Sequence, residues 1–129
     1  MERRIKVYFD GGCRPNPGPM EAAVVIRGRA HVFDDLGSGT NTQAEWQALL
    51  CALELAQAAG LKDFDLLGDS REVTGAANRA LVQGQASTGP AQAFLALAAG
   101  HPPRRVRWIA RAQNLAGIAL EKRRESGAG

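Results

Sequence analysis

The sequence has few cysteines and few aromatic residues, and it lacks any long apolar run. Cys13 and Cys51 are the only cysteines among 129 residues, too few for a disulfide framework or a zinc site, which favours a reducing compartment. No run approaches the ~20 apolar residues of a membrane-spanning helix. The first residues lead directly into a strand pattern, so we expect no signal peptide, no membrane contact and a cytoplasmic location.

The composition is that of a globular protein, with 45% apolar and 22% charged residues. We expect one domain over residues 1–125, a flexible tail over 126–129, and a monomer without an obligate protein partner. The net charge is +3, and basic residues gather late in the chain: Arg104, Arg105, Arg107, Arg111, Lys122, Arg123 and Arg124. Such a cluster is usually a solvated surface, but it also suits a polyanionic partner.

Hydrophobic periodicity and turn residues predict an α/β fold. The predicted strands are 5–9, 22–26, 30–36, 64–67 and 105–109, and the predicted helices are 43–59, 71–82, 90–100 and 113–124. The first three strands have connections too short for parallel crossovers, so they form an antiparallel meander. The last two join through helices, which predicts a five-stranded mixed sheet with three antiparallel and then two parallel strands, flanked by helices.

Three acidic residues stand where strands end or a helix begins. Asp10 follows an apolar strand and precedes Gly11-Gly12, and Asp69 follows the fourth strand. Glu45 lies on the apolar stripe of the helix between them, one turn before Leu49. Each acid also has a structural explanation: a turn at Asp10, a capping box from Thr42 to Glu45, and a helix N-cap at Asp69.

These acids share one site if the two strands are neighbours. Three unpaired carboxylates at one sheet edge repel one another, and burial increases that repulsion. A hard divalent cation relieves it, and oxygen-only ligands favour Mg²⁺ or Mn²⁺ over zinc. Convergence of all three acids is harder to explain by local structure than any one of them alone.

Four segments carry a resemblance to a known family. The segments 10–19, 40–45, 68–70 and 111–116 resemble the signature segments of type 1 ribonuclease H, in order and nearly along the whole chain. The resemblance implies a ribonuclease H-like fold and cleavage of the RNA strand of RNA/DNA hybrids, leaving 5′-phosphate and 3′-hydroxyl ends. It also implies that Asp10, Glu45 and Asp69 are catalytic and hold two Mg²⁺ or Mn²⁺ ions with substrate.

The resemblance further implies a set of substrate-binding residues around the minor groove of the hybrid, where 2′-hydroxyls distinguish RNA from DNA. These residues are Gly11, Cys13, Asn16, Thr40, Asn41 and Gln43. Thr40 and Asn16 would lie nearest a DNA phosphate. Cys13 is equally well explained as a small buried apolar residue.

The chain departs from the family pattern at Gly117, where the family has a fourth carboxylate. Asn114 and Glu121, each about one helical turn away, are possible weak substitutes, although a surface position explains Glu121 better. The family's mobile histidine has no clear counterpart, since His101 precedes the fifth strand and His31 lies in the meander. No basic insertion that would act as a substrate handle is present.

Two functions remain open from the sequence. The favoured one is a metal-dependent endonuclease acting on RNA/DNA hybrid, with activity reduced by the change at Gly117. The alternative is a catalytically impaired ribonuclease H-fold protein that binds hybrid or other nucleic acid. The three acids favour the first, because a pure binding protein has no evident need for them.

Overall fold

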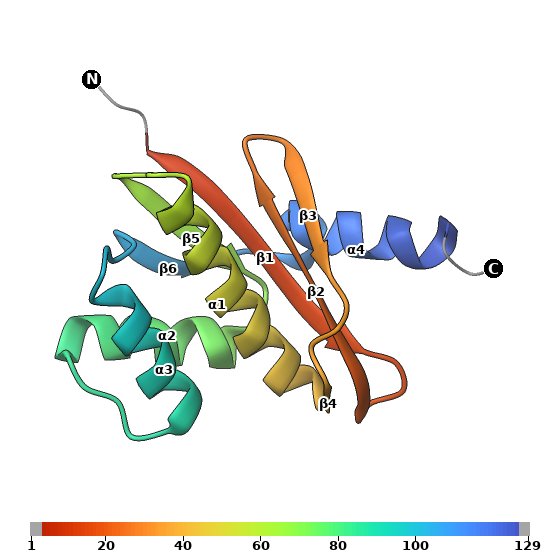
Figure 1. Cartoon of the computed structure of the whole chain (residues 1–129), viewed down its shortest axis with the longest axis horizontal. Coiled ribbons are helices and arrows are strands. Elements are labelled where there is room, and N and C mark those ends of the chain that lie inside the picture. The colour runs from red at the N-terminus through yellow and green to blue at the C-terminus, as the bar shows by residue number, and fades with distance from the viewer. Residues whose placement is uncertain (1–3, 127–129) are drawn as a thin grey trace.

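The computed structural model describes residues 4–126. Four α-helices and six strands make up this part of the chain (Figure 1). In chain order they are β1 (Ile5–Cys13), β2 (Gly18–Ile26), β3 (Arg29–Phe33), β4 (Ser38–Gly39), α1 (Asn41–Ala58), β5 (Phe64–Gly68), α2 (Arg71–Gln83), α3 (Gly89–Ala98), β6 (Arg105–Trp108) and α4 (Leu115–Ser126), with a 3₁₀ turn at Arg111–Gln113 before α4.

The sheet has the order β3-β2-β1-β5-β6, and the two-residue β4 pairs with the start of β2. β1, β2 and β3 pair antiparallel, while β5 pairs parallel to β1 and β6 parallel to β5. This arrangement confirms the predicted mixed sheet. Because β1 and β5 are parallel neighbours, residues near their carboxyl ends lie close together at the same edge of the sheet.

Alternation along the central strand creates a core on each face of the sheet. Val7 and Phe9 are fully buried in a core cluster to which the helices α1, α2 and α3 all contribute. Tyr8 faces the other way and packs with Ala116 and Leu120 of α4. Figure 1 shows α4 apart from the other three helices, and the two core clusters place it on the opposite face.

The first strand continues past the residue at which the sequence predicts that it ends. β1 runs to Cys13, so Asp10 lies within the strand and is paired with Ala23 of β2. The strand predicted over 5–9 is therefore too short, and the turn considered at Asp10 does not occur. A β-carbon at Gly11 would lie 2.1 Å from the backbone oxygen of Ala44, so glycine serves here to let α1 approach the strand closely.

Other element boundaries differ from the sequence prediction by a few residues. The third strand, predicted over 30–36, ends at Phe33 as β3, and β4 lies beyond the predicted range. The last helix begins at Leu115 after the 3₁₀ turn. Ser126, assigned above to the flexible tail, is the last residue of α4, and the rest of that tail, 127–129, lies outside the described residues. No described helix combines the length and apolar character needed to cross a bilayer.

Candidate active site

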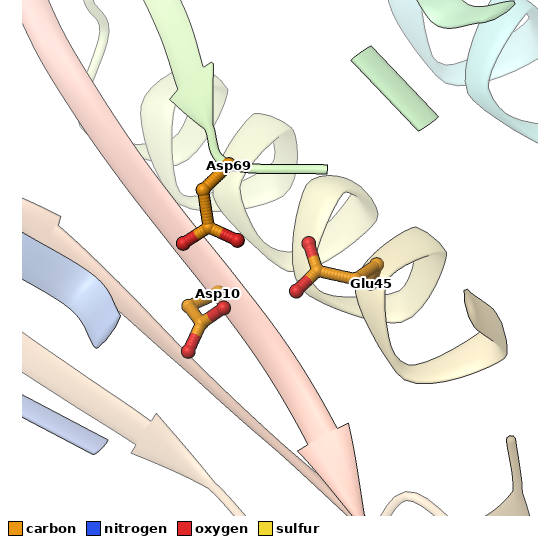
Figure 2. A group of neighbouring side chains, drawn as sticks. All are labelled: Asp10, Glu45 and Asp69. Carbon is orange, nitrogen blue, oxygen red and sulfur yellow. The ribbon is translucent and has the colours of Figure 1, made fainter. Parts of the chain in front are cut away.

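The fold brings the three predicted acids together. Asp10 comes from β1, Glu45 from the first turns of α1, and Asp69 from the residue after β5, and Figure 2 shows their side chains pointing toward one another. One carboxylate oxygen of each lies within 4.8 Å of those of the other two. Asp10 and Glu45 are buried, at 4% and 8% exposure.

Burial and mutual repulsion shift the ionisation of this cluster. Burial, followed by contact with Asp10 and the charge of Asp69, raises the pKa of Glu45 to about 9, against a partial lowering by the Gly11 amide. Burial also raises the pKa of Asp10, and the charge of Asp69 adds to this, while Glu45, Arg111 and Arg124 act in the opposite direction. Without a cation, the site therefore favours protonated carboxyls.

The structural explanations for Glu45 and Asp69 do not apply. The capping box of α1 is formed by Thr40 and Gln43, whose side chain accepts a hydrogen bond from the Thr40 amide at 2.8 Å. The N-cap of α2 is Ser70. Glu45 instead accepts a hydrogen bond from the Gly11 amide through Oε1 at 3.2 Å, which holds its carboxylate beside β1.

The donor set fits a divalent cation. The Oε2 atom of Glu45 is buried and has no hydrogen-bond partner within residues 4–126, which is costly for a charged oxygen unless something positive faces it. All three side chains offer only carboxylate oxygens, the ligands that Mg²⁺ and Mn²⁺ accept most readily. The residues present therefore fit such an ion.

Asn114 fixes the position of one acid. Its side chain is fully buried, and its Nδ2 atom donates to Asp69 Oδ2 at 2.9 Å and to the Phe9 backbone oxygen at 3.0 Å. Its Oδ1 atom accepts from the Ala116 amide at the start of α4. Since the amide group is occupied in this way, Asn114 is disfavoured as a substitute for a missing metal ligand and acts as a positioning residue for Asp69.

Gly117 faces the acids from the other face of the sheet. A β-carbon built at Gly117 would lie 3.4 Å from Asp10 Oδ2 and 3.7 Å from Asp10 Cγ. A side chain at this position would thus reach the carboxylate cluster directly. The described structure has glycine there, so α4 contributes no carboxylate from this position.

Glu121, the other possible substitute, is engaged elsewhere. Its Oε1 atom lies 2.6 Å from Arg14 Nη2 and 3.7 Å from Arg124 Nη1, and its side chain is 43% exposed. Arg124 also pairs with Glu21. This network ties the end of α4 to the loop after β1, and it disfavours Glu121 as a ligand.

Most of the predicted substrate-binding residues line one depression of about 490 Å³ next to the acids. Gly11, Cys13, Asn16 and Asn41 line it together with Asp10 and Glu45. The Asn41 side chain accepts from the Cys13 amide at 3.0 Å, and the Asn16 side chain accepts from the Asn41 amide at 3.1 Å.

Thr40 and Gln43 are absent from the lining of this depression, and their side chains form the capping box of α1. The Cys13 side chain is buried beside Met20 and Ala44, which agrees with its reading as an apolar residue.

The late basic cluster is mostly ion-paired. Asp65, which the sequence analysis missed, is buried and faces Arg4, Arg105 and Arg107, while Arg123 pairs with Glu21. Every residue of β5 is buried, so no alternation of apolar and polar residues along this strand marks Asp65 in the sequence.

Two members of the basic cluster, Arg111 and Arg124, line the depression at the acids. Arg111 also lies 3.7 Å from Asp69 Oδ1. The site therefore combines a carboxylate cluster with two arginines, which suits a phosphate-bearing ligand.

Neither histidine reaches the site. His101 contacts the Lys62 backbone oxygen at 2.9 Å and stacks on Phe64, which begins β5, whereas Asp69 follows the end of that strand. His31 pairs with Val24 at the edge of the sheet.

Comparison with known proteins identifies the family. A family model described as reverse transcriptase-like matches residues 8–123. The chain belongs to this family. Ribonuclease HI of Halobacterium salinarum is 42% identical over an alignment of 82 residues, and the match covers 57% of this chain and 41% of that relative. The chain thus spans less than half the length of this curated relative.

Solved structures support the same relationship. The crystal structure of RNase H1 from Halobacterium salinarum aligns with a TM-score of 0.75 and 28% identity over 97% of this chain and 99% of that one. LC11-RNase H1, solved in complex with an RNA/DNA hybrid, aligns with a TM-score of 0.67 and 25% identity over 98% and 100%. This chain is a ribonuclease H homologue with the ribonuclease H-like fold, as the sequence predicts.

The raised pKa of Glu45 predicts that Glu45→Gln stabilises this ribonuclease H homologue in the absence of metal. The pKa of the Glu45 carboxyl is about 9 in the folded state, against an ordinary value of 4.5. The folded protein therefore loses stability as the pH rises between these two values. Thermal unfolding in EDTA should show little difference between parent and variant at pH 4, and a growing advantage for the variant toward pH 9. Each 1 kcal/mol gained corresponds to about 4 °C.

Glu54→Gln is the matched control, because Glu54 is exposed on the same helix. Millimolar Mg²⁺ should raise the melting temperature of the parent more than that of Glu45→Gln. A difference between parent and Glu45→Gln that stays constant with pH would contradict the ionisation described above.

Proposed function

We propose that this protein is a metal-dependent endonuclease that hydrolyses the RNA strand of RNA/DNA hybrids. The observation that carries the proposal is the buried convergence of Asp10, Glu45 and Asp69, with an unpartnered Glu45 oxygen, beside a depression lined by polar loop residues. The relatives named ribonuclease H and the relative solved with a hybrid support it.

Asp10, Glu45 and Asp69 would hold two Mg²⁺ or Mn²⁺ ions. Such ions would supply neutralisation of carboxylate and phosphate charge and Lewis-acid activation of water, the chemistry needed to hydrolyse RNA to 5′-phosphate and 3′-hydroxyl ends. The Gly11 amide orients Glu45, and Asn114 orients Asp69. Orientation of this kind keeps the carboxylates in place without rearrangement during the reaction.

The depression supplies a basis for choosing RNA over DNA. We propose that the loop backbone and the side chains of Asn16 and Asn41 contact 2′-hydroxyls in the minor groove. Thr40, the N-cap of α1, would lie nearest a DNA phosphate together with Asn16, and Gln43 in the first turn of α1 would face the minor groove. Arg111 and Arg124, which line the depression, add attraction for phosphates that does not depend on base sequence.

A second function is favoured by one specific observation, the glycine at position 117. Because α4 offers no carboxylate beside Asp10 at this position, the ion that activates water would have one protein ligand fewer than in the family pattern. A protein of this kind binds hybrid and cleaves it slowly or not at all. The two functions predict the same complex and differ in the rate of cleavage.

The test is to incubate end-labelled RNA/DNA hybrid, RNA duplex and DNA duplex with the protein in Mg²⁺ and in Mn²⁺. We expect cleavage of the RNA strand of the hybrid alone, and tighter binding of hybrid than of DNA duplex at the same salt. Affinity for hybrid should fall as salt rises. Binding without cleavage would establish the second function, and equal affinity for hybrid and DNA duplex would contradict both.

A further inference from the structure

A second depression, of about 390 Å³, lies between α2 and β6. It is lined by Arg71, Thr74, Gly75, Asn78, Arg79, Val106 and Trp108, and we call it the α2–β6 groove. None of these residues lines the depression at the acids. The groove nevertheless adjoins the candidate active site, because Trp108 Nε1 donates a hydrogen bond to the backbone oxygen of Asp69 at 3.1 Å.

Two arginines on one face of α2 give the groove positive charge. Arg71, Gly75 and Arg79 are spaced four residues apart, so they lie along one side of the helix, with about 12 Å between the outer two. A β-carbon at Gly75 would lie 3.2 Å from Arg79 Nη1, so the glycine leaves room for that guanidinium to lie back along the helix.

Neither groove arginine has an ion-pair partner among residues 4–126, in contrast to Arg105 or Arg123. Guanidiniums without an ion-pair partner are free to donate charge-assisted hydrogen bonds to the phosphates of a bound strand. The groove therefore suits a ligand with negative charges spaced along it.

The groove also contains a flat surface. The Arg71 guanidinium carbon lies 3.6 Å from the centre of the Trp108 ring, and the indole is 39% exposed. Asn78 accepts a hydrogen bond from the Val106 amide through Oδ1, which leaves its Nδ2 hydrogens free to donate within the described part of the chain. Unpaired bases stack on aromatic rings and on guanidinium planes, whereas the faces of bases in a duplex are already covered.

We propose that the α2–β6 groove binds a single-stranded segment of nucleic acid that continues from the strand held at Asp10, Glu45 and Asp69. Phosphates would lie against Arg71 and Arg79, and a base would stack beside Trp108. The inference rests on the proposed function, since it extends the path of that substrate. The proposal predicts that a hybrid with a single-stranded extension binds more tightly than a blunt hybrid with the same length of duplex.

The experiment measures binding by fluorescence anisotropy in the Asp10→Asn background, in Mg²⁺, so that the substrate is not cut. Five probes are used: a blunt hybrid, and the same hybrid with a six-nucleotide extension at each of the four strand ends. We expect at least one extension to tighten binding by about fivefold or more, the size that stacking of one base produces. In the Arg71→Ala/Arg79→Ala variant, the ratio of extended to blunt affinity should fall to about one, because the extension gains no further contact.

The matched control is Arg29→Ala/Lys62→Ala, which removes two exposed cations away from the groove and should preserve the ratio. The inference is overturned if no extension tightens binding, or if the control double variant lowers the ratio as much as the groove variant does. A free pyrimidine oligonucleotide separates the two proposals. Loss of its binding in the groove variant supports the groove even if the blunt hybrid is neither bound nor cut, a result that would refute only the proposed function.

Discussion

Asp10→Asn is expected to lower the rate of hybrid cleavage by about 1000-fold or more. Asp10 contributes to a three-carboxylate cluster that is buried and fits a divalent cation, and asparagine keeps its shape while removing the charge. A metal ion supplies several kcal/mol of transition-state stabilisation, and each 1.4 kcal/mol is tenfold in rate. The variant should fold. In EDTA its melting temperature should equal or exceed that of the parent, because the substitution removes a carboxyl whose pKa is raised by burial and whose charge is therefore unfavourable.

The control for Asp10→Asn is Asp35→Asn, which removes an exposed acid and should leave the rate unchanged. Initial rates are measured in Mg²⁺ and Mn²⁺ with the RNA strand labelled. If Asp10→Asn cuts hybrid as fast as the parent, the reaction occurs elsewhere on the molecule.

Gly117→Asp is expected to raise the rate of hybrid cleavage by about tenfold or more, the lower end of the effects seen when the environment of a metal ligand is changed. A side chain at 117 would begin 3.4 Å from Asp10 Oδ2, so its carboxylate reaches the cluster. The gain should be larger in Mg²⁺, which demands a more regular ligand geometry than Mn²⁺. Without metal, the added acid increases repulsion within the cluster and should lower the melting temperature.

Gly117→Ala separates the ligand effect from the helix effect. Alanine removes the cost of a glycine within a helix, roughly 0.5–1 kcal/mol, without supplying an oxygen, so it should stabilise the protein and leave the rate unchanged. Glu121→Gln should also leave the rate unchanged, because Glu121 pairs with Arg14 and Arg124. An unchanged rate in Gly117→Asp together with a severe loss in Glu121→Gln would place the fourth ligand at Glu121 instead.

Local sequence signals predicted the element types and the pairing of the sheet. Apolar alternation at Val7 and Phe9 and the i, i+4 stripe of α1 reflect burial directly, and short connections require antiparallel neighbours. The end of β1 was not predictable in the same way. Gly11-Gly12 is a turn signal in an isolated segment, and only the packing of α1 against the strand shows that glycine is needed for close approach.

The candidate site was predictable as a set of residue types and less so as a set of contacts. The sequence placed Asp10, Glu45 and Asp69 at one edge on the condition that their two strands are neighbours, and the pairing of β1 with β5 meets that condition. The positioning role of Asn114 depends on three hydrogen bonds between distant segments, and no spacing in the sequence indicates them.

The α2–β6 groove was likewise beyond sequence analysis. Arg71 and Trp108 are 37 positions apart, since 108 − 71 = 37, and they meet only through the packing of α2 beside β6. The local pattern around each of these residues carries no signal of the contact between them.

The most direct test of a metal-dependent site at the three acids is the chemistry of the RNA ends produced from hybrid in Mn²⁺. Hydrolysis by an in-line water predicts fragments with 5′-phosphate and 3′-hydroxyl ends, which a polymerase extends from the 3′ end without prior treatment. These fragments should disappear when EDTA is added. Fragments with 5′-hydroxyl and 2′,3′-cyclic phosphate ends would show attack by the RNA's own 2′-hydroxyl, and would contradict the account.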